Sequence, residues 1–218
     1  MNDRGRKPQR VTLFQSKQLE ALTLISAKSF AILWALGLPL IALAGWNTTD
    51  AVTASMLVFV GLLVWILTEY VAHRFLFHWD TNMAAGKWLV FLMHGNHHVS
   101  PNDPLRNLMP PIVSIPVGLL VGAICVALVG PAGTWILLGF MSGYVAYDAV
   151  HYACHQASMR GSVGQALKRH HMRHHHIDEA GNYAITAIFL DYLFGSAITS
   201  VAGKSAARNA ARQEPPAR

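Results

Sequence analysis

The chain has 218 residues, of which 53% are hydrophobic and 13% charged, and it carries a net charge of +6. Soluble domains average about 25% charged residues, so this composition indicates a single-domain membrane protein. The apolar bulk and the lack of a basic patch interleaved with aromatic residues exclude a nucleic-acid-binding protein, although both tails are basic.

Residues 1–28 are predicted to form a basic tail and a helix at the membrane surface. The start of the chain, MNDRGRKPQR, is polar and basic. Val11, Phe14, Leu22 and Ile25 then share one face of a possible helix. An amphipathic helix of this kind lies in the plane of the membrane interface.

The next part of the chain contains four uncharged stretches, at 29–46, 51–68, 112–129 and 134–147. A membrane-spanning helix needs about 17–25 predominantly apolar residues. The short turns NTTD and GPAG join the stretches in pairs. The predicted fold is therefore an all-α membrane protein with four transmembrane helices in two hairpins.

We expect the membrane domain to cover residues 29–203 and a polar tail to occupy residues 204–218. The apolar segment TAIFLDYLFGSAITSVAG, at 186–203, is short and is broken by Asp191 and Gly195. Its length favours an interfacial or re-entrant helix over a fifth span.

The basic residues predict how the chain is oriented in the membrane. All seventeen Lys and Arg residues fall at 1–28, 74–106 and 160–218, so neither hairpin turn contains one. Because cytoplasmic loops are enriched in Lys and Arg, both termini and the central loop are expected in the cytoplasm.

All twelve histidines lie in four short motifs: HRFLFH at 73–78, HGNHH at 94–98, HYACH at 151–155 and HHMRHHH at 170–176. The predicted topology brings all four motifs to the cytoplasmic ends of the spans. Imidazole is the commonest metal ligand in proteins, and a set of this size predicts a metal centre.

The spacing selects ten of the imidazoles as ligands. Most pairs are separated by three or four residues, which places them on one face of a helix. His73 and His78 are five residues apart, so either the helix is distorted there or the two side chains bind different metals. Ten ligands suit two metals with five each. The predicted ligands are His73, His78, His94, His97, His98, His151, His155, His171, His174 and His175.

Further polar residues are expected to support these ligands. Metal-bound imidazoles usually donate their second N–H to a carboxylate or a carbonyl group. Glu69 and Asp148 precede His73 and His151 by four and three residues, so they are candidates for this role. His170 and His176 flank the last group of ligands and are assigned to the same outer layer.

At these motifs the sequence resembles the fatty acid hydroxylase / sterol desaturase superfamily of membrane di-iron oxygenases, and within it the fatty acid 2-hydroxylases. The resemblance covers residues 69–196. It is carried by EYVAHRFLFH, HGNHHVSPNDPLRNLMPP, YDAVHYACH, LKRHHMRHHH, NYAIT and DYLFGS.

The resemblance implies that the ten histidines bind two iron ions, although isolated protein could carry zinc. It also places Asp103 and Arg106 in a polar motif beside the site. Dioxygen would be the co-substrate, and the reaction would be hydroxylation of a lipid acyl chain, at C2 of a fatty acid or an acyl lipid.

Two sets of alternatives remain open from the sequence. Carotenoid and sterol hydroxylases or desaturases of the same superfamily use similar histidine motifs. A metal transporter belongs to a different class, and transporters place polar ligands near the bilayer midplane. The spans of this chain contain no such ligands.

The expected partners are a membrane lipid or fatty acyl substrate and a separate electron donor of the cytochrome or ferredoxin type. Some members of the superfamily carry a fused haem domain, for which this chain has no room. The short single-domain chain, without an endoplasmic-reticulum retrieval signal, favours a bacterial inner membrane with the metal site in the cytoplasm.

Overall fold

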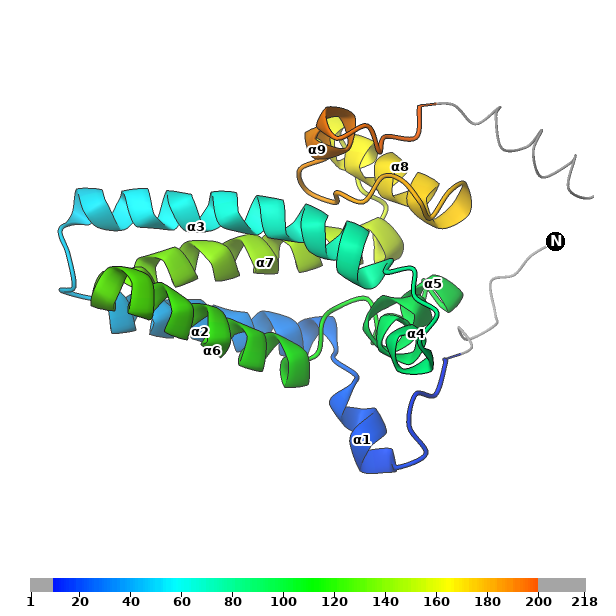
Figure 1. The fold of residues 1–218 in the computed structure, drawn as a ribbon, viewed down its shortest axis with the longest axis horizontal. Coiled ribbons are helices and arrows are strands. Elements are labelled where there is room, and N and C mark those ends of the chain that lie inside the picture. Colours follow the sequence, from blue (N-terminus) through cyan, green and yellow to red (C-terminus); the bar gives the residue numbers. More distant parts are fainter. Residues whose placement is uncertain (1–9, 200–218) are drawn as a thin grey trace, which may run out of the picture.

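The computed structural model describes residues 10–199, and these residues form an all-helical fold. Four long helices lie side by side, and α7 contacts each of the other three (Figure 1). They are α2 (Ala27–Gly45), α3 (Ala51–Val71), α6 (Pro111–Val129) and α7 (Gly133–Gln156).

Two turns lie together at one end of these helices. In the first turn, Asn47 has a positive φ of 62°, and the Asp50 side chain then caps α3 by accepting from the backbone N–H groups of residues 52 and 53. The second turn is the short 3-10 segment η3 (Gly130–Ala132). Trp135, in the first turn of α7, donates to the Thr48 hydroxyl and so joins the two turns.

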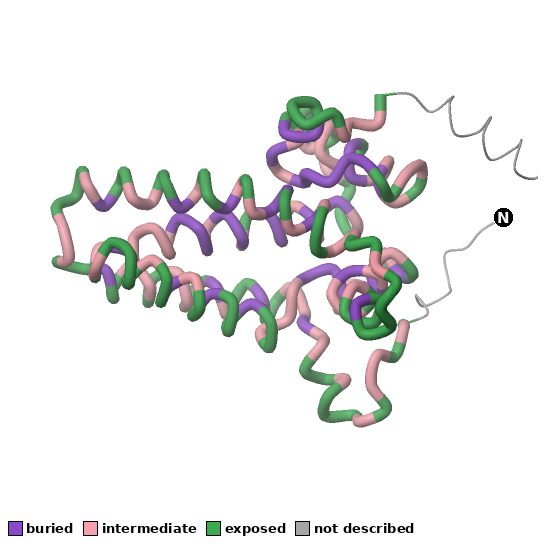
Figure 2. Tube along the Cα trace, viewed as in Figure 1, coloured by how far each residue is buried: buried purple, intermediate pink, exposed green. Residues whose placement is uncertain are grey.

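Three segments are long and apolar enough to cross a membrane: Ala27–Gly45, Ala51–Phe77 and Pro111–Gln156. The third has 46 residues and folds back at η3, so that α6 and α7 pack against each other (Figure 1). Outward-facing positions of these helices are exposed while inner positions are buried (Figure 2). These three segments confirm the prediction of apolar helices that are long enough to cross a membrane.

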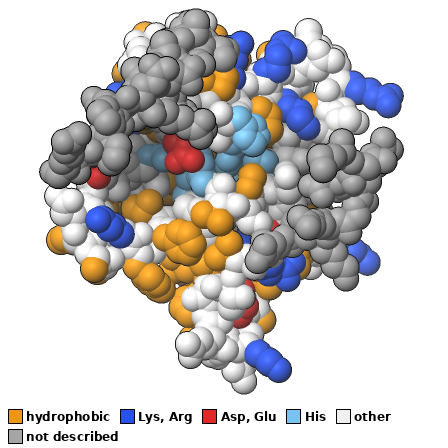
Figure 3. Space-filling view, turned by 90° about the vertical axis from the view of Figure 1, so that its right-hand side faces the viewer, with side chains coloured by type: hydrophobic (Ala, Val, Ile, Leu, Met, Phe, Trp, Pro, Cys, Tyr) orange, Lys and Arg blue, Asp and Glu red, His pale blue; other side chains and the backbone are white. Residues whose placement is uncertain are grey.

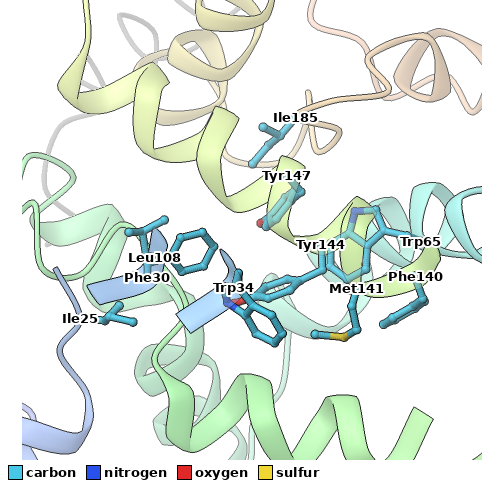
Figure 4. Packing of buried hydrophobic residues seen from close by; sticks show 10 residues of the cluster. All are labelled: Ile25, Phe30, Trp34, Trp65, Leu108, Phe140, Met141, Tyr144, Tyr147 and Ile185. Carbon is cyan, nitrogen blue, oxygen red and sulfur yellow. The ribbon is translucent and has the colours of Figure 1, made fainter. Parts of the chain in front are cut away.

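A cluster of buried aromatic residues holds α2, α3 and α7 together (Figure 4). The ring of Tyr144 on α7 makes edge contacts with Trp34 on α2 and Trp65 on α3, with centroids 5.4 and 5.5 Å apart. Edge-to-face pairs of this kind add stability beyond the area that they bury. The cluster thereby fixes α7 relative to α3, and both helices carry histidines at their ends.

The remaining elements lie at the end of the molecule away from the two turns (Figure 1). They are α1 (Lys17–Leu22), η1 (Ala72–Phe77), α4 (Ala84–Val90), η2 (Phe91–Gly95), α5 (Asn96–Val99), α8 (Ser162–His176) and α9 (Phe189–Leu193).

The helices predicted near the two ends of the chain are shorter in the structure than the sequence suggested. The helix expected within 11–28 is α1, which has six residues. The expected helix at 186–203 is represented by α9, which has five residues. Residues 1–9 of the basic tail, the end of the membrane domain at 200–203 and the polar tail 204–218 lie outside the described residues.

Candidate metal centre

His73 and His78 are brought together by a local change in the helix at the end of α3. The helix continues into η1, a π-helix in which the backbone N–H of His78 bonds to the carbonyl of His73 at 3.2 Å. In a π-helix the hydrogen bonds run between residues five apart, so these two residues fall on one side. Of the two alternatives that the sequence left open, the structure shows the distorted helix.

A second π-helix, η2, presents the next group of histidines. It passes into α5, and the two segments carry His94, His97 and His98. The side-chain amide of Asn96 donates to the carbonyls of Phe91 and Leu92 at 2.9 and 2.8 Å. These bonds satisfy carbonyl groups at a place where the regular helical ladder is interrupted.

The remaining histidines come from the last turns of α7 and from α8. His151 and His155 lie one turn apart on α7, and α8 carries His171, His174 and His175. Pairs four residues apart project from the same face of an α-helix, as the spacing predicts.

The ten histidines form two groups of five, within each of which one ligand atom per residue lies within 4.8 Å of all the others. We call the first group cluster 1; it consists of His73, His78, His94, His98 and His174. We call the second group cluster 2; it consists of His97, His151, His155, His171 and His175. The predicted division into five and five is therefore present in the structure.

The spacing of the ring nitrogens fits a metal ion in each cluster. In cluster 1 the Nε2 atoms of His94 and His98 lie 2.9 Å apart, and those of His98 and His174 lie 3.1 Å apart. In cluster 2 the contacts made by His97 with His151 and His175 are 3.0 and 3.1 Å. Metal–imidazole bonds of about 2.1 Å at right angles place two nitrogens about 3.0 Å apart.

Two backbone carbonyls orient the imidazoles of cluster 1. The Nδ1 of His174 lies 2.8 Å from the carbonyl of Gly181, and the Nδ1 of His73 contacts the carbonyl of Tyr183. A carbonyl oxygen can only accept, so Nδ1 carries the proton in both rings and Nε2 keeps its lone pair. Lone pairs that converge at 3 Å repel each other unless a cation lies between them.

The environment keeps these imidazoles neutral. Burial lowers the pKa of His78 to about 4 and the pKa values of His98 and His174 to about 3, helped in the latter two by neighbouring imidazoles. The pKa values of His94, His97 and His171 are also lowered, again mainly by burial. Neutral imidazole is the form that binds a metal, so both clusters are ready to do so at neutral pH.

The two carboxylates expected to receive imidazole N–H groups are both buried, but they bind backbone groups. Glu69 accepts from the N–H groups of Ile185 and Thr186 at 2.7 and 2.8 Å. Asp148 accepts from the N–H of Met109 at 2.9 Å. Glu69 therefore supports His73 through the loop that supplies its carbonyl partner.

Asp103 and Arg106 lie in the loop between α5 and α6 and pair with the N-terminal segment. Arg10 donates twice to Asp103, at 2.7 and 3.2 Å, and Arg106 forms an ion pair with Glu20. Burial opposes ionisation of Asp103, but the hydrogen bonds and charge of Arg10 outweigh this effect and lower its pKa. Neither Asp103 nor Arg106 belongs to cluster 1 or cluster 2.

His170 and His176, the two remaining histidines, have different surroundings. His170 is buried and its Nε2 lies 2.8 Å from Asp191. His176 is exposed, with its ring centroid 6.2 Å from that of His175. The structure thus places His170 within the packed interior behind the clusters and His176 at the surface.

Sequence reasoning missed the outer partners that are closest to the clusters. The carbonyls of Gly181 and Tyr183 leave no trace in residue type, because any residue supplies one. Asn107, whose amide nitrogen lies 3.4 Å from Nδ1 of His97, had no distinguishing signal either. Asp191 did have one, since a lone carboxylate in the apolar stretch AIFLDYLF needs buried partners.

Histidine side chains are visible on the end face of the molecule away from the turns, with an acidic side chain beside them (Figure 3). Hydrophobic side chains lie on one side of these histidines, and basic side chains are scattered over the same face (Figure 3).

Comparisons with known proteins agree with this site. The sequence profile of the fatty acid hydroxylase family matches residues 58–196, which include all ten histidines. The chain is 33% identical over 200 residues to the dihydroceramide fatty acyl 2-hydroxylase FAH1 of Arabidopsis thaliana, covering 87% of this chain and 81% of that protein.

A fatty acid 2-hydroxylase of Macaca fascicularis is 33% identical over 217 residues, which cover 86% of this chain and 57% of that longer protein. A solved structure described as full-length scs7p, with only the hydroxylase domain visible, superimposes with a TM-score of 0.77 and 28% identity. That match covers 85% of this chain and 71% of the other. The chain belongs to the fatty acid hydroxylase family, a family of oxidoreductases.

Proposed function

We propose that this protein is a membrane di-iron monooxygenase that hydroxylates a lipid acyl chain, at C2 of a fatty acid or of an acyl lipid. The observation that carries the proposal is the pair of five-histidine clusters at the ends of apolar helices. Membership of the fatty acid hydroxylase family supports iron as the metal and an acyl chain as the substrate.

The ten histidines of clusters 1 and 2 would hold the two ions. The five imidazoles of each cluster would bind one ion. When bound, the irons supply the activation of dioxygen: with two electrons and two protons, one oxygen atom enters a C–H bond and the other leaves as water. The chain itself supplies neutral, oriented ligands and a site bordered by apolar side chains.

In the membrane, α2, α3, α6 and α7 would form four crossings in two hairpins. The turns at Trp46–Asp50 and η3 lie at one end of the helices and the histidines at the other (Figure 1). The basic residues among the described positions 10–199 belong to the end with the histidines, which would therefore face the cytoplasm. Residues 29–203 would form this membrane domain, between a basic N-terminal segment and a polar tail.

A metal site where apolar helices leave the bilayer suits a substrate with a polar head at the interface and a chain in the lipid. The atoms next to the head group would then reach the clusters first, which favours oxidation beside the carboxyl carbon. The names of the Arabidopsis and Macaca relatives describe the same position of attack, on a dihydroceramide acyl chain and on a fatty acid.

Electrons would come from a separate carrier of the cytochrome or ferredoxin type. Basic side chains are present on the face of the molecule on which the histidines are visible (Figure 3). These charges would attract an acidic carrier to this face and speed its association at low salt.

The test is product analysis in membranes that contain the protein, a reductase system and ¹⁸O-labelled dioxygen. We expect a 2-hydroxy acid that carries one ¹⁸O atom per molecule, detected by mass spectrometry after hydrolysis of the lipids. The matched control is the variant His97→Ala, prepared in the same way. A hydroxylated ring or an unsaturated chain would instead identify a sterol, carotenoid or desaturase activity, and would overturn the proposed position of attack.

A further inference from the structure

Residues 183–186 form a stretch of backbone whose four consecutive N–H groups all donate to two buried carboxylates. Asp191 accepts from the N–H groups of Tyr183 and Ala184 at 2.9 and 2.8 Å. Glu69 accepts from the N–H groups of Ile185 and Thr186. The charge of each carboxylate is thereby used to hold a loop that has no regular secondary structure of its own.

The same loop provides the carbonyl groups that orient cluster 1. The carbonyl of Tyr183 accepts from Nδ1 of His73, and the carbonyl of Gly181 accepts from Nδ1 of His174. The N–H and the carbonyl of Tyr183 therefore link Asp191 on one side to His73 on the other. A shift of this backbone would turn the imidazole ring and move its Nε2 atom away from the cluster.

Asp191 is the carboxylate that binds the N–H groups on either side of the Tyr183 carbonyl. It is fully buried, and in addition to the two backbone bonds it accepts from His170 at 2.8 Å and from the Ser196 hydroxyl at 2.7 Å. Four hydrogen bonds compensate the cost of burying its charge. Through them it joins α8, the loop and the segment that follows α9.

Asn182 holds the adjoining part of the loop in a left-handed conformation, with φ of 55°. Its side chain donates to the carbonyl of His170 at 2.9 Å and accepts from the N–H of Ile198 at 2.7 Å. The peptide groups between Gly181 and Ala184 are therefore fixed from both sides, and His170 takes part in both sets of contacts.

We propose that Asp191 is a positioning residue for the metal of cluster 1, and that it acts through the carbonyls of Gly181 and Tyr183. The inference rests on the proposed function only in assuming that the clusters bind metal. Replacement of residues that orient metal ligands typically weakens metal binding by about 10–100-fold. We expect an effect of this size at cluster 1.

Cluster 2 has a different set of outer contacts, so it should be unaffected. Its His97 lies beside Asn107, which belongs to the loop that precedes α6. That loop is held by Asp103 through Arg10 and the N–H of Leu105. Asp103 is as deeply buried as Asp191, which makes it the matched control.

The experiment measures zinc binding by purified, full-length protein in lipid nanodiscs, with free zinc set by a chelator buffer. Two double variants serve as backgrounds, and in each of them only one cluster can bind zinc. The variant His155→Ala/His175→Ala disables cluster 2 and leaves cluster 1, whereas His78→Ala/His98→Ala does the opposite. All four of these histidines are half-buried, so the two backgrounds are comparable.

Asp191→Asn is then introduced into each background. We expect the free zinc concentration at half-saturation to rise by about 10–100-fold where only cluster 1 is intact, and to stay unchanged where only cluster 2 is intact. Asp103→Asn should not reproduce the shift at cluster 1. Recovery of full occupancy at higher free zinc distinguishes weakened binding from loss of folded protein.

A milder variant covers the case in which Asp191→Asn does not fold. His170→Phe keeps a buried ring but removes one of the four donors to Asp191, and should give a smaller shift in the same background. Equal shifts in both backgrounds, or none in either, would overturn the role of Asp191. If the wild-type protein and both backgrounds fail to bind zinc, the metal centre itself is wrong, which is a separate outcome.

Discussion

His97 and His98 are neighbours on α5, yet their imidazoles belong to different clusters. The Nε2 of His97 lies 3.0 Å from that of His151, whereas the Nε2 of His98 lies 2.9 Å from that of His94. Adjacent residues on a helix point about 100° apart, so one short helix can supply both clusters. α8 does the same, since His174 contributes to cluster 1 while His171 and His175 contribute to cluster 2.

The first prediction concerns this division of neighbouring histidines between the two clusters. We expect His97→Ala to lose the metal of cluster 2 and His98→Ala to lose that of cluster 1, so that each variant retains one ion per chain after dialysis against a chelator. Product formation should fall below detection in both, because the proposed chemistry needs both ions. Elemental analysis and product analysis of the same preparation give the two results.

The exposed residue His176 provides the control for this pair. His176→Ala should keep two ions and full activity, since its ring lies outside both groups. Retention of two ions by His97→Ala or His98→Ala would contradict the ligand assignment, as would loss of an ion from His176→Ala.

The sequence was sufficient to predict the apolar helices and the ten clustered imidazoles, because both follow from local patterns. Uncharged stretches identify the long helices, and spacings of three and four residues identify shared helical faces. The division into five and five followed from the number of ligands that one ion accepts.

The assignment of each imidazole to its cluster did not follow, because it depends on side-chain direction and on two π-helices. His73 and His78 share a cluster because the backbone between them forms a π-helix, and helix propensities do not predict where an α-helix becomes a π-helix. The partners of Glu69 were also out of reach, since the backbone of Ile185 lies 116 positions away in the chain. Long-range contacts with backbone groups leave no signature in residue type.

The second prediction concerns the contact between α3 and α7, which sets the positions of their histidines. A Cβ atom on Gly139 would lie 2.0 Å from the backbone carbonyl oxygen of Val58, and neither backbone can move without separating the helices. We expect Gly139→Ala to destabilise the protein by at least about 1–3 kcal/mol and to lower its metal content. Thermal unfolding followed by tryptophan fluorescence measures the first effect.

Gly164→Ala is the matched control for Gly139→Ala. A Cβ atom there meets its nearest neighbour, in Met159, at an ordinary 3.4 Å, and the residue lies within α8. Alanine has the higher helix propensity, so this variant should be at least as stable as the wild type. Equal behaviour of the two variants would argue against close packing of α3 on α7.

The third prediction concerns the ion pair between Arg10 and Asp103. Arg10→Ala should destabilise the protein by about 1 kcal/mol at pH 7, a modest value because the arginine is partly exposed while the carboxylate is buried. Lys17→Ala, which removes an exposed cation from the same segment, should have no such effect.

The pH dependence of this effect identifies the carboxylate as its source. The pair lowers the pKa of Asp103 below the ordinary 3.8, so its contribution is complete above that value and disappears as the pH falls below it. The difference in stability between Arg10→Ala and the wild type should therefore stay constant from pH 7 to about 5. A difference that already vanished in this range would exclude Asp103 as the partner.

The fourth prediction concerns the protein after its metal has been removed. Burial holds the pKa values of His98 and His174 at about 3, below the ordinary 6.5 that each regains when the chain unfolds. Between these values the unfolded chain binds protons that the folded protein does not, so stability falls as the pH falls below 6.5. Each such imidazole contributes a slope of up to about 1.4 kcal/mol per pH unit.

We therefore expect the melting temperature of metal-free protein in nanodiscs to be constant above pH 7 and to drop steeply between pH 6.5 and 5. Saturating zinc should raise the melting temperature at pH 7, because the ion binds the folded clusters. His98→Gln removes one of the responsible groups and should flatten the slope of the metal-free protein. A flat profile across this range would mean that the imidazoles are solvated when no metal is bound, and that the metal, and not the packing of the protein, draws them together.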